Sequence, residues 1–218
     1  ILETNVSILD SILDYVMLYA PDCQIILVSN PVDVLTYRTW QRTGWSRHRI
    51  YGQAGVLDSS RMAAFIAMES GYSAKEINAM VLGGHGDSMV PMIRYTTISG
   101  ICVDQLLEKE QIDAIIERTR HGGAEVLALR QTSSAYDAPA AAISAMVDAV
   151  GRARNSILPT VAILESEYGY EDVAMGVPCV LGADGMQKII QLDLTDEEKI
   201  MFDKSMKGVI ADIRKLKR

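Results

Sequence analysis

One histidine, His85, stands out because of the residues that surround it. It lies in segment 83–91, which reads GGHGDSMVP and follows the apolar segment 77–82. An imidazole has a reference pKa of about 6.5, so a histidine displayed by small residues at a strand end can exchange a proton near neutral pH. His85 is therefore the first candidate for acid–base chemistry. The alternative is a surface turn that carries an incidental histidine.

An acid and a base three residues apart, Asp58 and Arg61, suit the same chemistry. They lie in segment 52–61, GQAGVLDSSR, where a glycine-rich turn gives way to a helical pattern of apolar residues. Residues at i and i+3 share one helix face, so both side chains can point into one cleft. A carboxylate bonded to an imidazole nitrogen fixes its tautomer and favours its charged form, and a guanidinium can grip a substrate carboxylate at two points. The alternative is an ordinary ion pair on a solvated helix.

An amide, Asn30, ends the apolar stretch 25–30, and Pro31 follows it. The stretch is typical of a buried strand in a parallel sheet, and proline cannot continue the hydrogen-bonded ladder. Ligands of open α/β sheets bind beyond the carboxyl ends of the strands, so Ser29 and Asn30 are expected beside a ligand. The alternative is that Asn-Pro only begins a turn.

The sequence pattern predicts an α/β fold in two parts, whose helices and strands position these side chains. Residues 1–52 are expected to form the closing half of a Rossmann-type doubly wound sheet, and residues 53–218 a mixed α+β substrate and catalytic domain. The expected helices are 5–19, 32–43, 57–70, 110–130, 138–154 and one that begins after a capping box of Thr195 and Glu198; the expected strands are 24–30, 49–51, 77–83, 88–98, 159–165 and 176–181.

Composition excludes several classes of protein. The formal charge of −7 argues against a nucleic-acid partner, and no apolar run approaches the roughly 18 residues that a membrane span needs. The cysteines Cys23, Cys102 and Cys179 are odd in number and far apart, without metal spacing. Buried reduced thiols and a cytoplasmic location are therefore expected, with no metal site.

Three segments, 28–36 (VSNPVDVLT), 52–61 and 83–91, closely resemble the lactate/malate dehydrogenase family in order and spacing. Segments 135–142 (AYDAPAAA) and 176–182 (GVPCVLG) also look like family segments, so the resemblance runs through all 218 residues.

The resemblance implies a role for each matching residue and a homodimer or homotetramer with NAD as cofactor. His85 would donate and accept the proton, Asp58 would orient it, and Arg61 would bind the substrate carboxylate. Asn30 would bond near the reacting oxygen. The positions implied to contact the nicotinamide half of NAD are Asn5, Val28, Ser29 and Asn30.

Within the family, the malate branch fits better than the lactate branch. Lactate enzymes usually carry a glutamate before the histidine, where this chain has Gly84, and Met89 also resembles the malate side. The implied activity is NAD-dependent oxidation of malate to oxaloacetate, a dicarboxylic acid pair, and the alternative is lactate or another 2-hydroxy acid. One departure lies at 133–137, where SSAYD replaces the GSAYY of related malate enzymes and places an acid, Asp137, near the substrate.

The sequence lacks any Gly-x-Gly-x-x-Gly run to cradle a pyrophosphate. In the family, that loop and a mobile loop with two arginines precede the segment that resembles residues 1–5. We therefore expect the chain to be the carboxyl-terminal part of a longer enzyme, inactive alone. Two other classes stay open: a metal-dependent hydrolase that uses His85, Asp87 and Asp58 as ligands, and a catalytically silent interaction module.

Overall fold

The computed structural model describes residues 2–131 and 135–216. The helices are α1 (Leu2–Tyr19), α2 (Val32–Thr43), α3 (Gly55–Ser70), α4 (Lys109–Arg130), α5 (Asp137–Gly151) and α6 (Asp196–Ile213). The strands are β1 (Ile25–Leu27), β2 (Ile50–Gly52), β3 (Ile77–Asn78), β4 (Val81–Leu82), β5 (Val90–Pro91), β6 (Thr97–Ile98), β7 (Ile101–Cys102), β8 (Ser156–Glu165), β9 (Glu171–Gly182) and β10 (Gly185–Ile189). The predicted α/β class is confirmed.

A five-stranded sheet of order β1-β2-β8-β9-β10 forms the centre of the molecule. β1 and β2 are parallel, as expected for part of a doubly wound sheet, whereas β8, β9 and β10 pair antiparallel. Within the sheet, the parallel part and the antiparallel part are joined at β2 and β8 by one pair of opposite residues, Gly52 and Val161. The sheet is therefore continuous across the boundary expected near residue 52.

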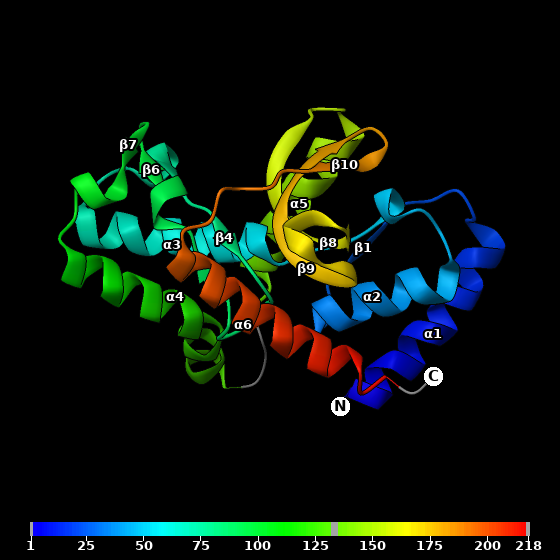
Figure 1. Ribbon diagram of the computed structural model, residues 1–218. Coiled ribbons are helices and arrows are strands. Elements are labelled where there is room, and N and C mark those ends of the chain that lie inside the picture. The colour runs from blue at the N-terminus through cyan, green and yellow to red at the C-terminus, as the bar shows by residue number, and fades with distance from the viewer. Residues whose placement is uncertain (1, 132–134, 217–218) are drawn as a thin grey trace.

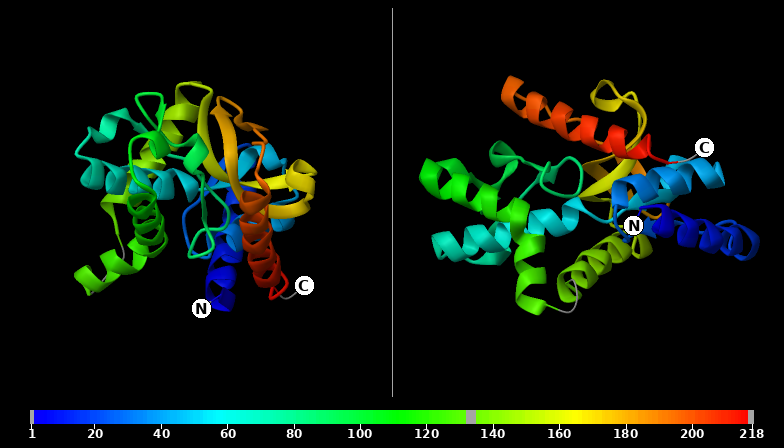
Figure 2. Two further views of the ribbon diagram at one scale, coloured as in Figure 1. Left: turned by 60° about the vertical axis from the view of Figure 1, so that its left-hand side comes forward. Right: turned by 90° about the horizontal axis from the view of Figure 1, so that it is seen from below.

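Three apolar clusters hold together the helices and strands whose arrangement Figures 1 and 2 show. In the largest, α5 and α6 pack against the two sides of β9 through buried side chains such as Met146 and Phe202. A second cluster lies between α3, α4 and the short strands, and a third between α2 and the strands β1, β2 and β8. These clusters fix α2, α3 and the 83–91 segment relative to one another.

Local signals in the sequence explain the helix ends. α2 and α3 stop at Gly44 and Gly71, whose φ angles of +64° and +73° favour glycine. α6 begins with the predicted capping box, in which Thr195 and Glu198 satisfy each other's backbone N–H groups. The α6 prediction is thereby confirmed.

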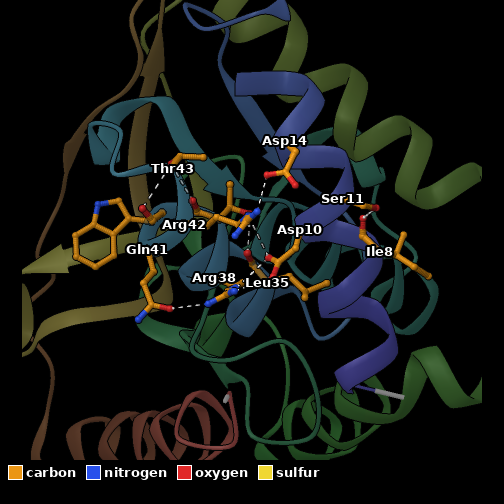
Figure 3. A network of polar contacts seen from close by, with 11 residues as sticks. Ile8, Asp10, Ser11, Asp14, Leu35, Arg38, Gln41, Arg42 and Thr43 are labelled. Carbon is orange, nitrogen blue, oxygen red and sulfur yellow. Dashed lines mark hydrogen bonds and ion pairs between the residues drawn. The ribbon is translucent and has the colours of Figure 1, made fainter. Parts of the chain in front are cut away.

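α1 is tied to α2 by ion pairs (Figure 3). The Arg38 guanidinium donates to both oxygens of Asp10, at 3.0 and 2.7 Å, and Arg42 pairs with Asp14 one turn further along. These half-exposed pairs fix the orientation of α1, which carries Asn5, against α2, which follows Asn30.

The short strands differ from the sequence expectations. Segments 77–83 and 88–98 were expected as continuous strands, but each contains two separate two-residue strands, divided by irregular backbone at 79–80 and by a 3-10 helix at Ile93–Tyr95. β7 and β10 were not predicted. Of the cysteines, Cys179 is buried and unpaired, whereas Cys23 and Cys102 are free but half-exposed, so the expectation of buried thiols is wrong for those two. Among residues 2–131 and 135–216, no helix has the length and apolar composition that crossing a bilayer requires.

Candidate active site

The structure brings His85 and Asp58 together, although 27 positions separate them. Nδ1 of His85 lies 2.9 Å from Oδ2 of Asp58. Asp58 sits in the first turn of α3 with its side chain 2% exposed, and His85 lies in the loop between β4 and β5 with its side chain 20% exposed. A carboxylate so deeply buried holds one face of the imidazole and leaves Nε2 as the nitrogen available for exchange.

The charges around His85 favour its protonated form. Burial acts to lower the pKa of His85, but the hydrogen bond and charge of Asp58, together with the charge of Asp33, outweigh it. Arg61 opposes them, yet the pKa lies above its ordinary value of 6.5. Near neutral pH, a larger fraction of His85 is therefore protonated than of an unperturbed imidazole.

Arg61 lies beside this pair. Its Nη1 donates to Oδ1 of Asp58 at 3.2 Å, so the i,i+3 ion pair exists, but in a buried site and not on a solvated surface. The stem of Arg61 crosses α4 at Gly122, where a Cβ would lie 2.4 Å from its Cδ. Only glycine leaves room for the arginine at this crossing.

A cavity of about 470 Å³ opens in front of the imidazole. Its lining combines His85 with two guanidinium side chains and small or polar groups. The lining residues are Asn30, Pro31, Arg61, His85, Gly86, Asp87, Met89, Arg120, Gly123 and Ala124. The cavity therefore offers one proton-transfer group and positive charge for an anionic ligand of small size.

The loop that carries His85 is held by hydrogen bonds from three successive backbone N–H groups. Gly83 donates to the carbonyl of Gly176 in β9 at 2.9 Å, and Gly84 to Oγ of Ser205 in α6 at 2.9 Å. The N–H of His85 itself donates to Oδ2 of Asp33 at 3.0 Å. Three elements far apart in the chain thus fix the backbone beneath the imidazole.

The residues expected at the cofactor lie at the carboxyl end of β1. Nδ2 of Asn5 donates to the carbonyl of Asn30 at 2.7 Å, and Asn30 lines the His85 cavity. Asn5 and Ser29 line a second cavity of about 220 Å³ with apolar side chains of α1, β1 and α2. Val28, 39% exposed, lies just before Ser29. Polar amides beside apolar walls fit a planar carboxamide ring such as nicotinamide.

Two family models match the chain. Residues 1–52 match the NAD binding domain of lactate/malate dehydrogenase, and residues 55–218 match its alpha/beta C-terminal domain. The chain belongs to the lactate/malate dehydrogenase family. A curated malate dehydrogenase from Thioalkalivibrio sulfidiphilus is 65% identical over 217 residues, which cover 100% of this chain and 71% of that protein.

Solved structures of the lactate/malate dehydrogenase family share the fold. A malate dehydrogenase from Salinibacter ruber is 40% identical with a TM-score of 0.94, over 96% of this chain and 68% of that one. A lactate dehydrogenase from Cryptosporidium parvum, with lactic acid and nicotinamide adenine dinucleotide, is 35% identical with a TM-score of 0.95, over 99% and 71%. Solved structures with this fold therefore carry both names, and the identities of the two groups to this chain overlap.

Two further residues of this family member were not singled out from the sequence. Asp33 is 6% exposed, and its neighbours in the sequence are buried apolar residues. Nothing in the sequence therefore indicates that its carboxyl group makes a polar contact. Arg120 lines the cavity, and its buried Nε has no hydrogen-bond partner among the described residues. A single arginine in a charged helical segment does not by itself indicate a binding or catalytic role.

Asp87 does not join His85 and Asp58 as a ligand set. Its side chain is 84% exposed, and its Oδ1 lies 3.8 Å from Nδ1 of His121. Within the described part of the chain, no group of three His, Cys, Asp or Glu side chains is arranged to hold a metal ion, so nothing there supports the hydrolase alternative. Of the departure at 133–137, Ser133 and Ser134 lie outside the described residues, and Asp137 is 98% exposed at the start of α5.

Proposed function

We propose that the protein is an NAD-dependent malate dehydrogenase that interconverts malate and oxaloacetate. The observation that carries the proposal is the His85 imidazole, bonded to buried Asp58 and facing a cavity that Arg61 also lines. The match of residues 1–52 to an NAD-binding domain and the 65% identity to a malate dehydrogenase support it.

His85 transfers the proton in this proposal. In oxaloacetate reduction, Nε2 of the protonated imidazole donates its proton to the keto oxygen, and Asp58 stabilises the charge on the ring before transfer. In malate oxidation, neutral His85 takes the hydroxyl proton. Bound NAD supplies the hydride acceptor, and its reduced form the hydride donor. Asn30 would bond near the reacting oxygen, and Asn5, Val28 and Ser29 would hold the nicotinamide end of bound NAD; Asn5 is bonded to the Asn30 carbonyl and lines a cavity with Ser29.

Two guanidinium groups suit a substrate with two carboxylates. Arg61 is assigned the carboxylate next to the reacting carbon, because it shares Asp58 with His85. Arg120, which also lines the cavity, is assigned the second carboxylate; its Nη1 lies 3.8 Å from Glu117, but its buried Nε has no hydrogen-bond partner among the described residues. A monocarboxylate such as pyruvate would leave Arg120 without a ligand.

The domain division and the cellular setting remain parts of the proposal. We assign residues 1–52 to the cofactor side and residues 53–218 to the substrate side, as the boundaries of the two family models support. A cytoplasmic homodimer or homotetramer is proposed, supported by the free cysteines and by exposed apolar side chains on α1, such as Ile8, Ile12 and Tyr15.

The test compares two keto acids as substrates of the active protein. We expect kcat/KM for oxaloacetate to exceed that for pyruvate by at least about tenfold, the ratio that about 1.4 kcal/mol of differential binding gives. Arg120→Gln should reduce this preference, mainly through KM for oxaloacetate. A preference for pyruvate would assign the protein to the lactate side, and absence of turnover with either acid would favour the silent interaction module.

The crossing of Arg61 over α4 gives a second prediction. Gly122→Ala places a methyl group 2.4 Å from Cδ of Arg61, so the stem must move and the guanidinium with it. We expect KM for oxaloacetate to rise by about tenfold with a smaller change in kcat, measured by steady-state kinetics. Gly208→Ala is the control, because Gly208 is an exposed helix glycine of α6 and its Cβ would meet nothing within 4 Å. Equal KM values for the two variants would contradict the role of Arg61.

A further inference from the structure

Asp33 is a buried carboxyl group directly beneath the proposed proton-transfer residue. It lies in the first turn of α2, where its side chain is 6% exposed. Its Oδ2 accepts the backbone N–H of His85 at 3.0 Å, while its Oδ1 is buried without a hydrogen-bond partner among the described residues. Buried polar atoms are nearly always paired, so an unpaired carboxyl oxygen at this place needs a reason.

His85 is therefore contacted by two carboxyl groups from different helices. Asp58 of α3 acts on the imidazole, and Asp33 of α2 acts on the backbone of the same residue. The other charged or titratable groups described around the loop are Arg61 from α3, Arg120 and His121 from α4, Lys204 from α6 and Asp87 of the loop itself. Arg61 is already bonded to Asp58, and Asp87 is exposed, so Asp33 is the second buried negative charge available to the imidazolium.

We propose that Asp33 is a positioning residue for His85, which when ionised holds the His85 backbone N–H and stabilises the protonated imidazole. A carboxylate accepts a backbone N–H more strongly than a neutral carboxyl group does, so ionisation of Asp33 tightens the loop. The placement of Asp33 near the amino end of α2, where the helix dipole favours negative charge, supports the ionised form. The inference rests on the proposed function only for its kinetic consequence.

The two groups titrate together. Burial raises the pKa of Asp33 to about 6, although the His85 backbone N–H and the His85 charge act to lower it. The charge of Asp33 in turn acts to raise the pKa of His85. Asp33 thus gains its charge in the range in which an imidazole loses its own, and each charge stabilises the other.

The test is an NMR titration of the histidine ring carbons, which needs no enzymatic activity. The chain has three histidines, so His85→Asn assigns the His85 signal, and His48 and His121 serve as internal references. Asp33→Asn keeps an acceptor for the His85 N–H but removes the charge. We expect the His85 midpoint to move to lower pH, with the reference midpoints unchanged. Asp14→Asn, which removes one charge from α1, is the control and should leave His85 where it is.

A kinetic arm separates this inference from the proposed function. In the active protein, Asp33→Asn should move the pH profile of kcat/KM for malate to lower pH, because neutral His85 is then reached earlier. A shifted NMR midpoint in a protein without malate turnover would overturn the function and keep the inference. Malate turnover with an unshifted midpoint and profile would overturn the inference alone.

If Asp33→Asn does not fold, the wild-type protein is used to test the proposed role of Asp33. The 13C signal of the Asp33 carboxyl group should titrate near pH 6, and the His85 ring signal should show a second inflection at the same pH. A single inflection for His85, with Asp33 titrating in the ordinary aspartate range, would overturn the proposal.

Discussion

Replacing His85 with asparagine is expected to lower kcat for oxaloacetate reduction by about 10²- to 10⁴-fold, the range that a lost general acid usually costs. Asparagine keeps a polar side chain of similar reach but has no proton to donate at neutral pH. KM should change little, because Arg61 and Arg120 remain in the cavity. The rate is followed by the oxidation of NADH, and substrate affinity by steady-state kinetics.

The control for His85→Asn is His121→Asn at the rim of the same region. The His121 side chain is 54% exposed and bonds to Glu117 on its own helix, so its removal should leave kcat within about twofold of wild type, as surface changes usually do. A His85→Asn variant with kcat close to that of wild type would remove the imidazole from the proton-transfer step.

Asp58→Asn is expected to have the second largest effect, a fall in kcat of about 10²-fold. The amide of asparagine has nearly the same shape as the carboxylate, but it carries no charge to stabilise the imidazolium. It can also turn its NH2 group toward Nδ1 of His85, where the carboxylate would accept a hydrogen bond. Arg61 loses its carboxylate partner at the same time. Leaving these buried groups poorly paired should also lower the free energy of unfolding by about 1–3 kcal/mol.

The pH dependence distinguishes Asp58→Asn from general damage to the fold. Asp58 acts to raise the pKa of His85, so its loss should lower that pKa. Oxaloacetate reduction needs protonated His85 and should therefore lose its rate at a lower pH than in wild type, while the acid limb of malate oxidation moves in the same direction. Asp148→Asn, at a surface ion pair of α5, is the control. A fall in kcat without movement of either limb would indicate that Asp58 only supports the fold.

Much of the fold was predictable because its signals are local. The helices follow from apolar periodicity and from the Thr195–Glu198 capping box, which the structure confirms. Gly44 and Gly71, which end α2 and α3, are the type of residue that favours a helix end, although they were not singled out from the sequence. The broken strands between 77 and 102 were not predictable in detail, since two-residue strands carry too few residues for a period of two to show.

The candidate site was predictable where a motif carries its own chemistry. Asp58 and Arg61 share a helix turn, and the glycines around His85 single it out, so their convergence needed only the family resemblance. Asp33 and Arg120 could not be found in this way. Their part in the site depends on which elements pack together, and the contact between Asp33 and His85 spans 52 positions.

The position of Ser205 in the chain affects when the site can form during protein synthesis. Oγ of Ser205 accepts the backbone N–H of Gly84 across 121 positions of the chain, from a helix that the ribosome produces well after the loop that carries His85. Contacts so distant form only after much chain entropy has been lost. A nascent chain that still lacks α6 has neither this bond nor the apolar contacts of α6 with β9, so the loop that carries His85 is held less firmly until α6 has been added.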